Sequence, residues 1–94
     1  MQGRLLELSE LRYTPAGVPV VEFRLDHESE QQEARGKRKV KAEIPAVAFE
    51  AQARLIAAAR PGAEVKVRGF LGAKSARSKK LVLHTTEIEF LEGN

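Results

Sequence analysis

The stretch Ala46–Arg60, AVAFEAQARLIAAAR, is the one segment of the chain whose apolar residues are spaced as in a helix. Phe49, Ala53 and Ile56 recur at intervals of three or four residues, which puts them on one helical face. Pro61-Gly62 follows directly, and this dipeptide is typical of the point where a helix stops. The sequence therefore predicts a single helix over residues 46–60.

Strand patterns flank this helix on both sides. Apolar and polar residues alternate, as in strands with one buried face, over residues 1–11, 21–27, 39–44, 64–71 and 81–91. The clearest pattern is the second, in which Val21, Phe23 and Leu25 alternate with polar residues. In the last segment the parity changes between Leu83 and Ile88, which predicts a bend or a bulge.

The connecting segments carry signals of their own. Thr14–Gly17, TPAG, combines proline with glycine and predicts a turn between the first two strands. Residues 28–36, ESEQQEARG, are polar and lack apolar periodicity, so they predict a loop or a flexible hairpin. Pro45 is expected to end the third strand. Three phenylalanines are expected in the core: Phe23, Phe49 and Phe90.

The order of three strands, a helix and two strands within 94 residues is that of the OB-fold, an all-β barrel of five strands with one helix. Closing the barrel also removes the exposed edges that an open sheet would leave. We therefore expect one OB-fold domain over residues 1–94. In this fold the ligand crosses strands two and three, between the loop joining strands one and two and the loop joining strands four and five.

Basic residues are concentrated in two runs that contain no acid, residues 35–41 (RGKRKVK) and 74–80 (KSARSKK). Nine of the 16 lysines and arginines lie in these runs, whereas the rest of the chain holds seven basic and all 13 acidic residues. A charged run alone is usually a solvated loop. In an OB-fold, however, both runs fall on the binding face, so we predict that they bind the phosphates of a nucleic acid. The predicted contacts are Arg35, Lys37, Arg38, Lys39, Lys41, Lys74, Arg77, Lys79 and Lys80.

The expected ligand is a single strand rather than a duplex. The predicted helix carries only Arg54 and Arg60 as cations, so it lacks the character of a recognition helix for the major groove. A basic groove suits the backbone of a single strand.

Several kinds of site are excluded. The chain has no cysteine, which rules out disulfides and thiolate metal sites. His27 and His84 lack acids or cysteines at metal-ligand spacing, and neither a Walker loop nor a nucleophile elbow occurs. We expect a protein that is no enzyme and takes no cofactor, metal or small-molecule substrate. Because there is no signal-peptide pattern and no window apolar enough for a membrane span, we expect a cytoplasmic location and no membrane partner.

Short motifs taken in order resemble one family. They are Arg12–Val20 (RYTPAGVPV), Leu25–Ser29 (LDHES), Ile44-Pro45, Gly69–Leu71 (GFL) and Leu81–His84 (LVLH). Their spacing across nearly the whole chain is similar to that of the primosomal replication protein N (PriB) family, relatives of bacterial single-stranded DNA-binding proteins. The resemblance implies a homodimer of OB-folds that binds single-stranded DNA, stimulates the PriA helicase and helps a primosome to reload the replicative helicase.

The resemblance also implies site residues. The family's DNA-binding surface includes lysines between strands four and five, whose counterparts here are Lys74, Lys79 and Lys80, with Arg77 beside them. Better-known members carry aromatic residues near the start of strand three, where this chain has Gly36 and Lys41 and no tryptophan. Because base stacking contributes about 1–3 kcal/mol per base, we expect binding here to depend mainly on charge.

Tyr13 and Phe70 are the aromatic residues left to stack on bases. An alternative for Tyr13, which lies beside the predicted turn, is packing over the mouth of the barrel. Alternatives for Phe70 are a dimer contact and a small second core under the helix.

Two other classes of function stay open. A general single-strand-coating protein of this fold is expected to have a glycine-rich extension and an acidic tail, whereas this chain ends at Asn94, just after the last strand. The other class is an OB module that binds RNA or only docks proteins. Its cold-shock type would need clusters of surface aromatics, which the sequence does not show.

Overall fold

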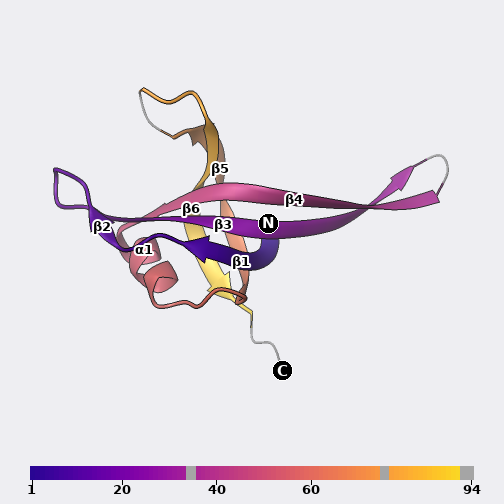
Figure 1. Ribbon diagram of the computed structural model, residues 1–94, viewed down its shortest axis with the longest axis horizontal. Helices are drawn as coiled ribbons and strands as arrows, with labels where there is room; N and C mark the ends of the chain where they lie inside the picture. Colours follow the sequence, from indigo (N-terminus) through magenta and orange to yellow (C-terminus); the bar gives the residue numbers. More distant parts are fainter. Residues whose placement is uncertain (34–35, 75–76, 92–94) are drawn as a thin grey trace.

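The computed structural model describes residues 1–33, 36–74 and 77–91 of the chain (Figure 1). Its elements in these residues are β1 (Gln2–Leu8), β2 (Arg12–Tyr13), β3 (Pro19–Glu33), β4 (Gly36–Phe49), α1 (Glu50–Ala57), β5 (Glu64–Ala73) and β6 (Leu81–Phe90). Within the described ranges, no helix is long and apolar enough to cross a membrane.

Five of the strands close into a barrel. The sheet order β1-β5-β6-β4-β3 returns to its start because β1 also pairs with β3, while the short β2 pairs with β3 alone. β4 and β6 run parallel, with Ala46 opposite Leu83 and Val47 opposite His84, and the other pairings are antiparallel. A small closed barrel of this strand order with one helix after its third long strand is an OB-fold, as the sequence predicted.

Alternate strand residues fill the barrel with apolar side chains. The largest fully buried side chains of the strands are Leu5, Val21, Leu25, Val65 and Val67. Ala53 and Ile56 of α1 are fully buried against the same cluster, which confirms the predicted apolar face for these two residues but not for Phe49. Phe23 is also in this core.

The predicted helix begins four residues too early. Ala46–Phe49 continue β4, and the helix starts only at Glu50. Ala46 and Val47 pair with β6, and this pairing closes the barrel. The alanine-rich composition favours a helix, but the backbone hydrogen bonds and burial gained by closing the sheet outweigh this local propensity.

Pro45 does not end the third long strand, contrary to the prediction. It lies inside β4 opposite Arg24. Because β6 pairs with β4 only from Ala46 onward, Pro45 has no β6 partner on that side, which is where a strand tolerates proline.

For residues 28–33 the structure shows the second of the two predicted alternatives, a hairpin rather than a loop, because these residues continue β3. Their ladder with β4 extends from Glu28 opposite Lys41 to Glu33 opposite Gly36, so the two strands form a long hairpin that projects from the barrel (Figure 1). The projecting arm has no core to face and therefore shows no apolar periodicity. Backbone pairing and cross-strand charge pairs define it instead.

The last strand has the irregularity that its mixed parity predicted. The β5–β6 register shifts after Arg68, so that Glu87 faces Arg68 while Thr85 faces Gly69, and Thr86 is the extra residue. The expectation of a buried Phe49 and Phe90 is wrong, since these side chains are 38% and 39% exposed. Phe49 has the parity of the outward-facing Val47 rather than that of the core residues Ala46 and Ala48, and Phe90 is the last residue of β6.

Candidate nucleic-acid interface

An open groove of about 660 Å³ lies on the outside of the barrel, across β3 and β4. Its apolar lining includes Pro45, Val47 and Leu81, and its polar lining includes Glu22, Lys74 and Lys80. The groove therefore lies on the strands that the OB-fold uses for binding, with the β5–β6 loop at its edge.

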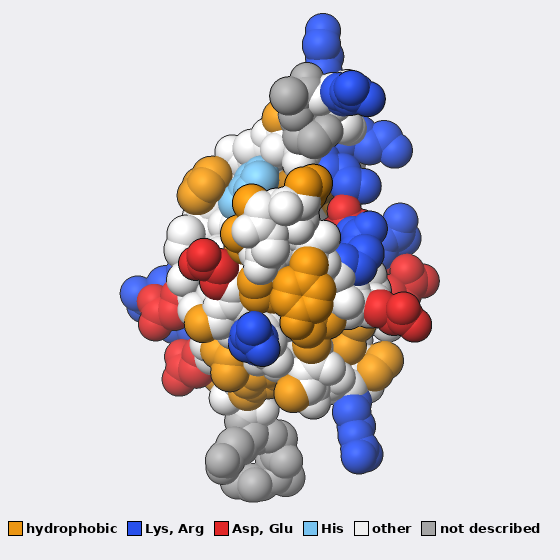
Figure 2. Space-filling model, turned by 90° about the vertical axis from the view of Figure 1, so that its left-hand side faces the viewer, with side chains coloured by type: hydrophobic (Ala, Val, Ile, Leu, Met, Phe, Trp, Pro, Cys, Tyr) orange, Lys and Arg blue, Asp and Glu red, His pale blue; other side chains and the backbone are white. Residues whose placement is uncertain are grey.

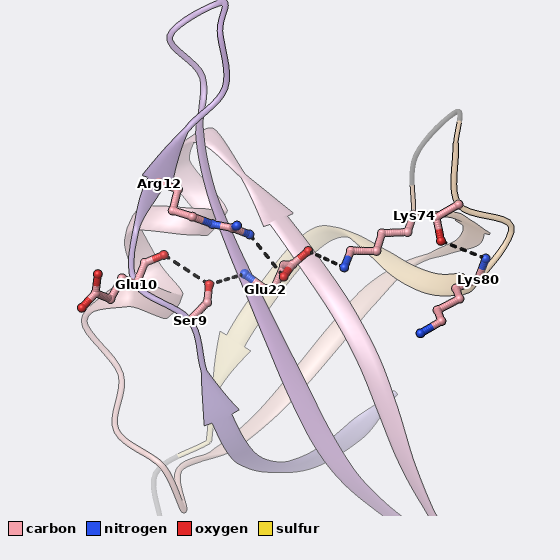
Figure 3. A network of polar contacts seen from close by, with 7 residues as sticks. Ser9, Glu10, Arg12, Glu22, Lys74 and Lys80 are labelled. Carbon is pink, nitrogen blue, oxygen red and sulfur yellow. Dashed lines mark hydrogen bonds and ion pairs between the residues drawn. The ribbon is translucent and has the colours of Figure 1, made fainter.

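The β5–β6 loop is held closed at its base. The backbone N–H of Lys74 donates to the carbonyl oxygen of Lys80 at 2.8 Å, which brings both ends of the second basic run to the groove (Figure 3). Arg77 and Lys79 are exposed on this loop. Most of the lysine and arginine side chains visible in Figure 2 gather toward this end of the molecule.

A carboxylate in the groove joins the loop to the rest of the barrel. Glu22 of β3 lies 3.2 Å from the Lys74 ammonium through Oε1 and 3.2 Å from the Arg12 guanidinium through Oε2 (Figure 3). The Glu22 backbone N–H donates to Ser9 Oγ at 2.9 Å. Three chain segments thus meet at one residue, and sequence reasoning had assigned Glu22 no role beyond an outward acid.

The first basic run occupies a different place from the second. Lys41 lines a second hollow of about 460 Å³ with Asp26 and Glu28, farther along β3 from the groove. The Lys39 ammonium lies 3.8 Å from Glu28. The structure therefore does not bring these two lysines into the groove with Lys74, and it sets them beside acids.

Three basic residues complete the first run: Arg35, Lys37 and Arg38. Arg35 lies outside the described residues. Lys37 and Arg38 are placed only by backbone register, opposite Gln32 and Gln31. Over the whole hairpin, residues 28–41, five basic residues face three acidic ones, a net charge of +2 rather than the +5 of the run alone.

Three stacked rings lie beside the groove, next to the base of the β5–β6 loop, where His84 Nε2 is 2.9 Å from the Ala73 carbonyl oxygen. The His84 ring lies 5.2 Å from Phe70 and 6.5 Å from Phe49 between ring centroids, with interplanar angles of 8° and 10°. Phe49 and His84 occupy the next same-face positions after the groove residues Val47 and Val82. Phe70 is 59% exposed. We call these three residues the ring column.

Of the aromatic residues predicted to stack on bases, Phe70 belongs to the ring column and Tyr13 is exposed on β2. Sequence reasoning missed Phe49, assigned to the core, and His84, considered only as a metal ligand. The signal that would have found them is strand parity: Phe49 follows Pro45 and Val47 on one face of β4 once β4 is extended past Pro45.

Comparison with known proteins matches this architecture. Residues 1–87 fit the model of a family described as another single-strand binding protein family. The chain is 36% identical over 91 residues to replication restart protein PriB of Nitrosomonas europaea, covering 97% of this chain and 84% of that protein. It is 39% identical over 94 residues to the Bordetella pertussis protein of the same name, covering 100% and 88%.

The chain belongs to the replication restart protein PriB family. A solved PriB structure from Ralstonia solanacearum superposes with a TM-score of 0.83 at 33% identity, covering 97% of this chain and 96% of that one. The resemblance seen in the sequence motifs is thereby confirmed. The single-stranded DNA-binding protein of Thermus aquaticus has a TM-score of 0.79 at 23% identity over 98% of this chain and 48% of its own, which shows a shared fold.

Proposed function

We propose that this protein binds single-stranded DNA along the groove and the ring column, and that it acts in replication restart. The observation that carries the proposal is the continuity of the surface. The exposed cations at the base of the β5–β6 loop line the groove, and the ring column with its open Phe70 ring adjoins the same loop base through the contact of His84 with Ala73. A groove of cations interleaved with rings is the arrangement that holds phosphates and bases of one strand together.

The PriB family assignment supports the place of this activity in the cell. The curated PriB relatives are named for replication restart, and the matching family model for single-strand binding. We propose that the protein acts as a homodimer within a primosome, where it stimulates the PriA helicase and helps to reload the replicative helicase. The DNA contacts proposed in the β5–β6 loop are Lys74, Arg77, Lys79 and Lys80.

Reversing the charge of the loop tests the proposal. We expect a variant with Lys74, Arg77, Lys79 and Lys80 changed to Glu to lose binding of a fluorescent oligo-dT strand in an anisotropy titration. The matched control changes four basic residues away from the groove, Arg4, Arg54, Arg60 and Lys66, to Glu. This control makes the same change in net charge as the loop variant. If the DNA site lies at the loop, the control should lose much less affinity for oligo-dT. Equal losses in both variants would contradict a site at the loop.

Stimulation of PriA is measured on the same two variants by duplex unwinding. If the loop variant loses DNA binding and keeps the stimulation, the protein contact is separate from the DNA site. Competition between DNA and RNA strands of equal length decides between the DNA-binding and RNA-binding forms of the OB-fold. No binding of either strand by the wild type at low salt would reject the proposal.

A further inference from the structure

The Glu22 carboxylate has the surroundings of a bound phosphate. Each of its oxygens lies 3.2 Å from a different cation, Oε1 from Lys74 and Oε2 from Arg12. A phosphodiester is likewise a monoanion with two exposed oxygens, and charge-assisted contacts to lysine and arginine are the usual way to hold one. Glu22 and Lys74 both line the groove.

We propose that Glu22 is a built-in counterion, which occupies between Arg12 and Lys74 the position of one phosphate of the bound strand. Binding then exchanges the carboxylate for a phosphate. This inference rests on the proposed function and adds to it in two respects. It assigns Arg12, which lies outside both basic runs, as a phosphate contact, and it makes Glu22 a residue that limits affinity.

The exposure of the three side chains shows that the exchange is feasible. The side chains of Arg12, Glu22 and Lys74 are 56%, 37% and 47% exposed. Ion pairs this open to solvent stabilise a fold only weakly, because water competes for both partners. A phosphate can therefore displace the carboxylate without unfolding the region around it.

The arrangement also explains why the cations are aimed at the groove in the free protein. Arg12 lies on β2 and Lys74 lies at the base of the β5–β6 loop. The two side chains approach Glu22 from opposite sides of β3 (Figure 3). Long basic side chains lose rotamer freedom when they bind. Glu22 already restricts both of them near the position where a phosphate would lie, while its charge opposes the phosphate itself.

The decisive variant is Glu22→Gln, which keeps the size of the side chain and removes its charge. We expect it to bind oligo-dT about fivefold more tightly than the wild type at low salt. Its plot of log K against log salt should be steeper by about 0.7, the contribution of one additional single-strand phosphate. The control is Glu87→Gln, which breaks an ion pair with Arg68 on β5–β6 and should leave affinity unchanged. Equal affinities for the two variants would overturn the proposal.

A second set of variants separates counterion exchange from plain repulsion. In the exchange model, Glu22→Gln gains nothing when Arg12→Gln and Lys74→Gln are already present, because no cations remain to be released. If the gain is the same in both backgrounds, Glu22 acts only as a distant negative charge and the proposal is wrong. Glu22→Thr, with a residue suited to a strand, repeats the test if Glu22→Gln lowers the melting temperature.

The same titrations keep this inference distinct from the proposed function. If the wild type binds oligo-dT and Glu22→Gln binds it no more tightly, the counterion proposal is wrong and the proposed function stands. Failure of both the wild type and Glu22→Gln to bind oligo-dT at low salt rejects the proposed function and the inference with it. Binding by Glu22→Gln alone would support the counterion.

Discussion

At the scale of single residues, the ring column shows how a barrel without tryptophan can still offer an aromatic surface. The His84 ring is stacked against Phe70 on β5 and Phe49 on β4, and its Nε2 lies 2.9 Å from the Ala73 carbonyl oxygen. Held in this way, the imidazole supports the exposed Phe70 ring from one side. A base would stack on the open side, as on an aromatic platform.

Replacing Phe70 by Ala should therefore weaken single-strand binding by about 1–3 kcal/mol, the usual contribution of one stacked base. The slope of log K against log salt should stay the same, because no phosphate contact is removed. Anisotropy titrations at several salt concentrations measure both quantities. Phe90→Ala, which removes an exposed ring outside the ring column, is the control. An equal loss in the control would argue against stacking at Phe70.

Gly69 occupies the point where the strand bulge leaves no room for a side chain. A Cβ at this position would collide with the carbonyl oxygen of His84 in the neighbouring strand. We expect Gly69→Ala to lower the free energy of unfolding by about 1–3 kcal/mol, as overpacking usually does. At Gly72 a Cβ would meet side chains rather than backbone, His84 at 3.1 Å and Phe70 at 3.7 Å, so Gly72→Ala should cost less. Thermal denaturation of the two variants makes the comparison, and equal melting temperatures would contradict it.

At the scale of elements, the β3–β4 hairpin is a charged arm rather than a free basic loop. Its register sets Lys41 opposite Glu28 and Lys39 opposite Glu30, and Lys39 also approaches Glu28. The positive charge available to DNA is accordingly smaller than the basic run alone indicates. The basic run of the β5–β6 loop contains no acid of its own, and the acid that Lys74 approaches, Glu22, belongs to β3.

Charge exchange within the hairpin tests this pairing. Lys39→Glu should lower stability by about 0.5 kcal/mol, because it sets like charges beside and opposite one another. For a domain of this size that corresponds to a fall of about 2–4 °C in melting temperature. The fourfold variant Glu28→Lys/Glu30→Lys/Lys39→Glu/Lys41→Glu exchanges the charges of both facing pairs and should regain the wild-type value. No recovery would show that these side chains do not interact in solution.

At the scale of the whole molecule, we expect both phosphate contacts and base stacking to contribute to the free energy of DNA binding. If six phosphates are contacted, log K for oligo-dT should fall with log salt at a slope of about −4, which is about −0.7 per phosphate. Titrations across a range of salt concentrations give this slope. A value of about −1 or shallower would contradict a groove that acts mainly through its cations.

The fold was predictable because its strands bury one face each. Val21, Phe23 and Leu25 show this alternation plainly, and the order of elements then allows few architectures. The helix start was not predictable, because Ala46–Phe49 suit a helix or a buried strand equally well until β6 lies beside them. The hairpin was predicted only as an alternative to a loop, because an arm without a core has no apolar pattern that would distinguish the two.

The residues of the candidate site also fall into those that the sequence predicts and those that it does not. Lys74 and Lys80 were found because charge, fold order and family motifs all indicate the loop. Glu22 and Arg12 were not found, because an acid on an outward strand position and an isolated arginine are ordinary surface residues. Their role depends on distances between side chains from three segments of the chain.

The sequence by itself determined the strand order, the core, the family and the basic β5–β6 loop, because periodicity, motif spacing and charge runs are properties of neighbouring residues. Only the tertiary structure decided where β4 ends, which cations face acids, and that Glu22 lies between Arg12 and Lys74. These features depend on contacts between residues far apart in the chain. Such contacts are formed only when the barrel closes, and the helix predicted over Ala46–Arg60 gives way to a strand in its first four residues for that reason.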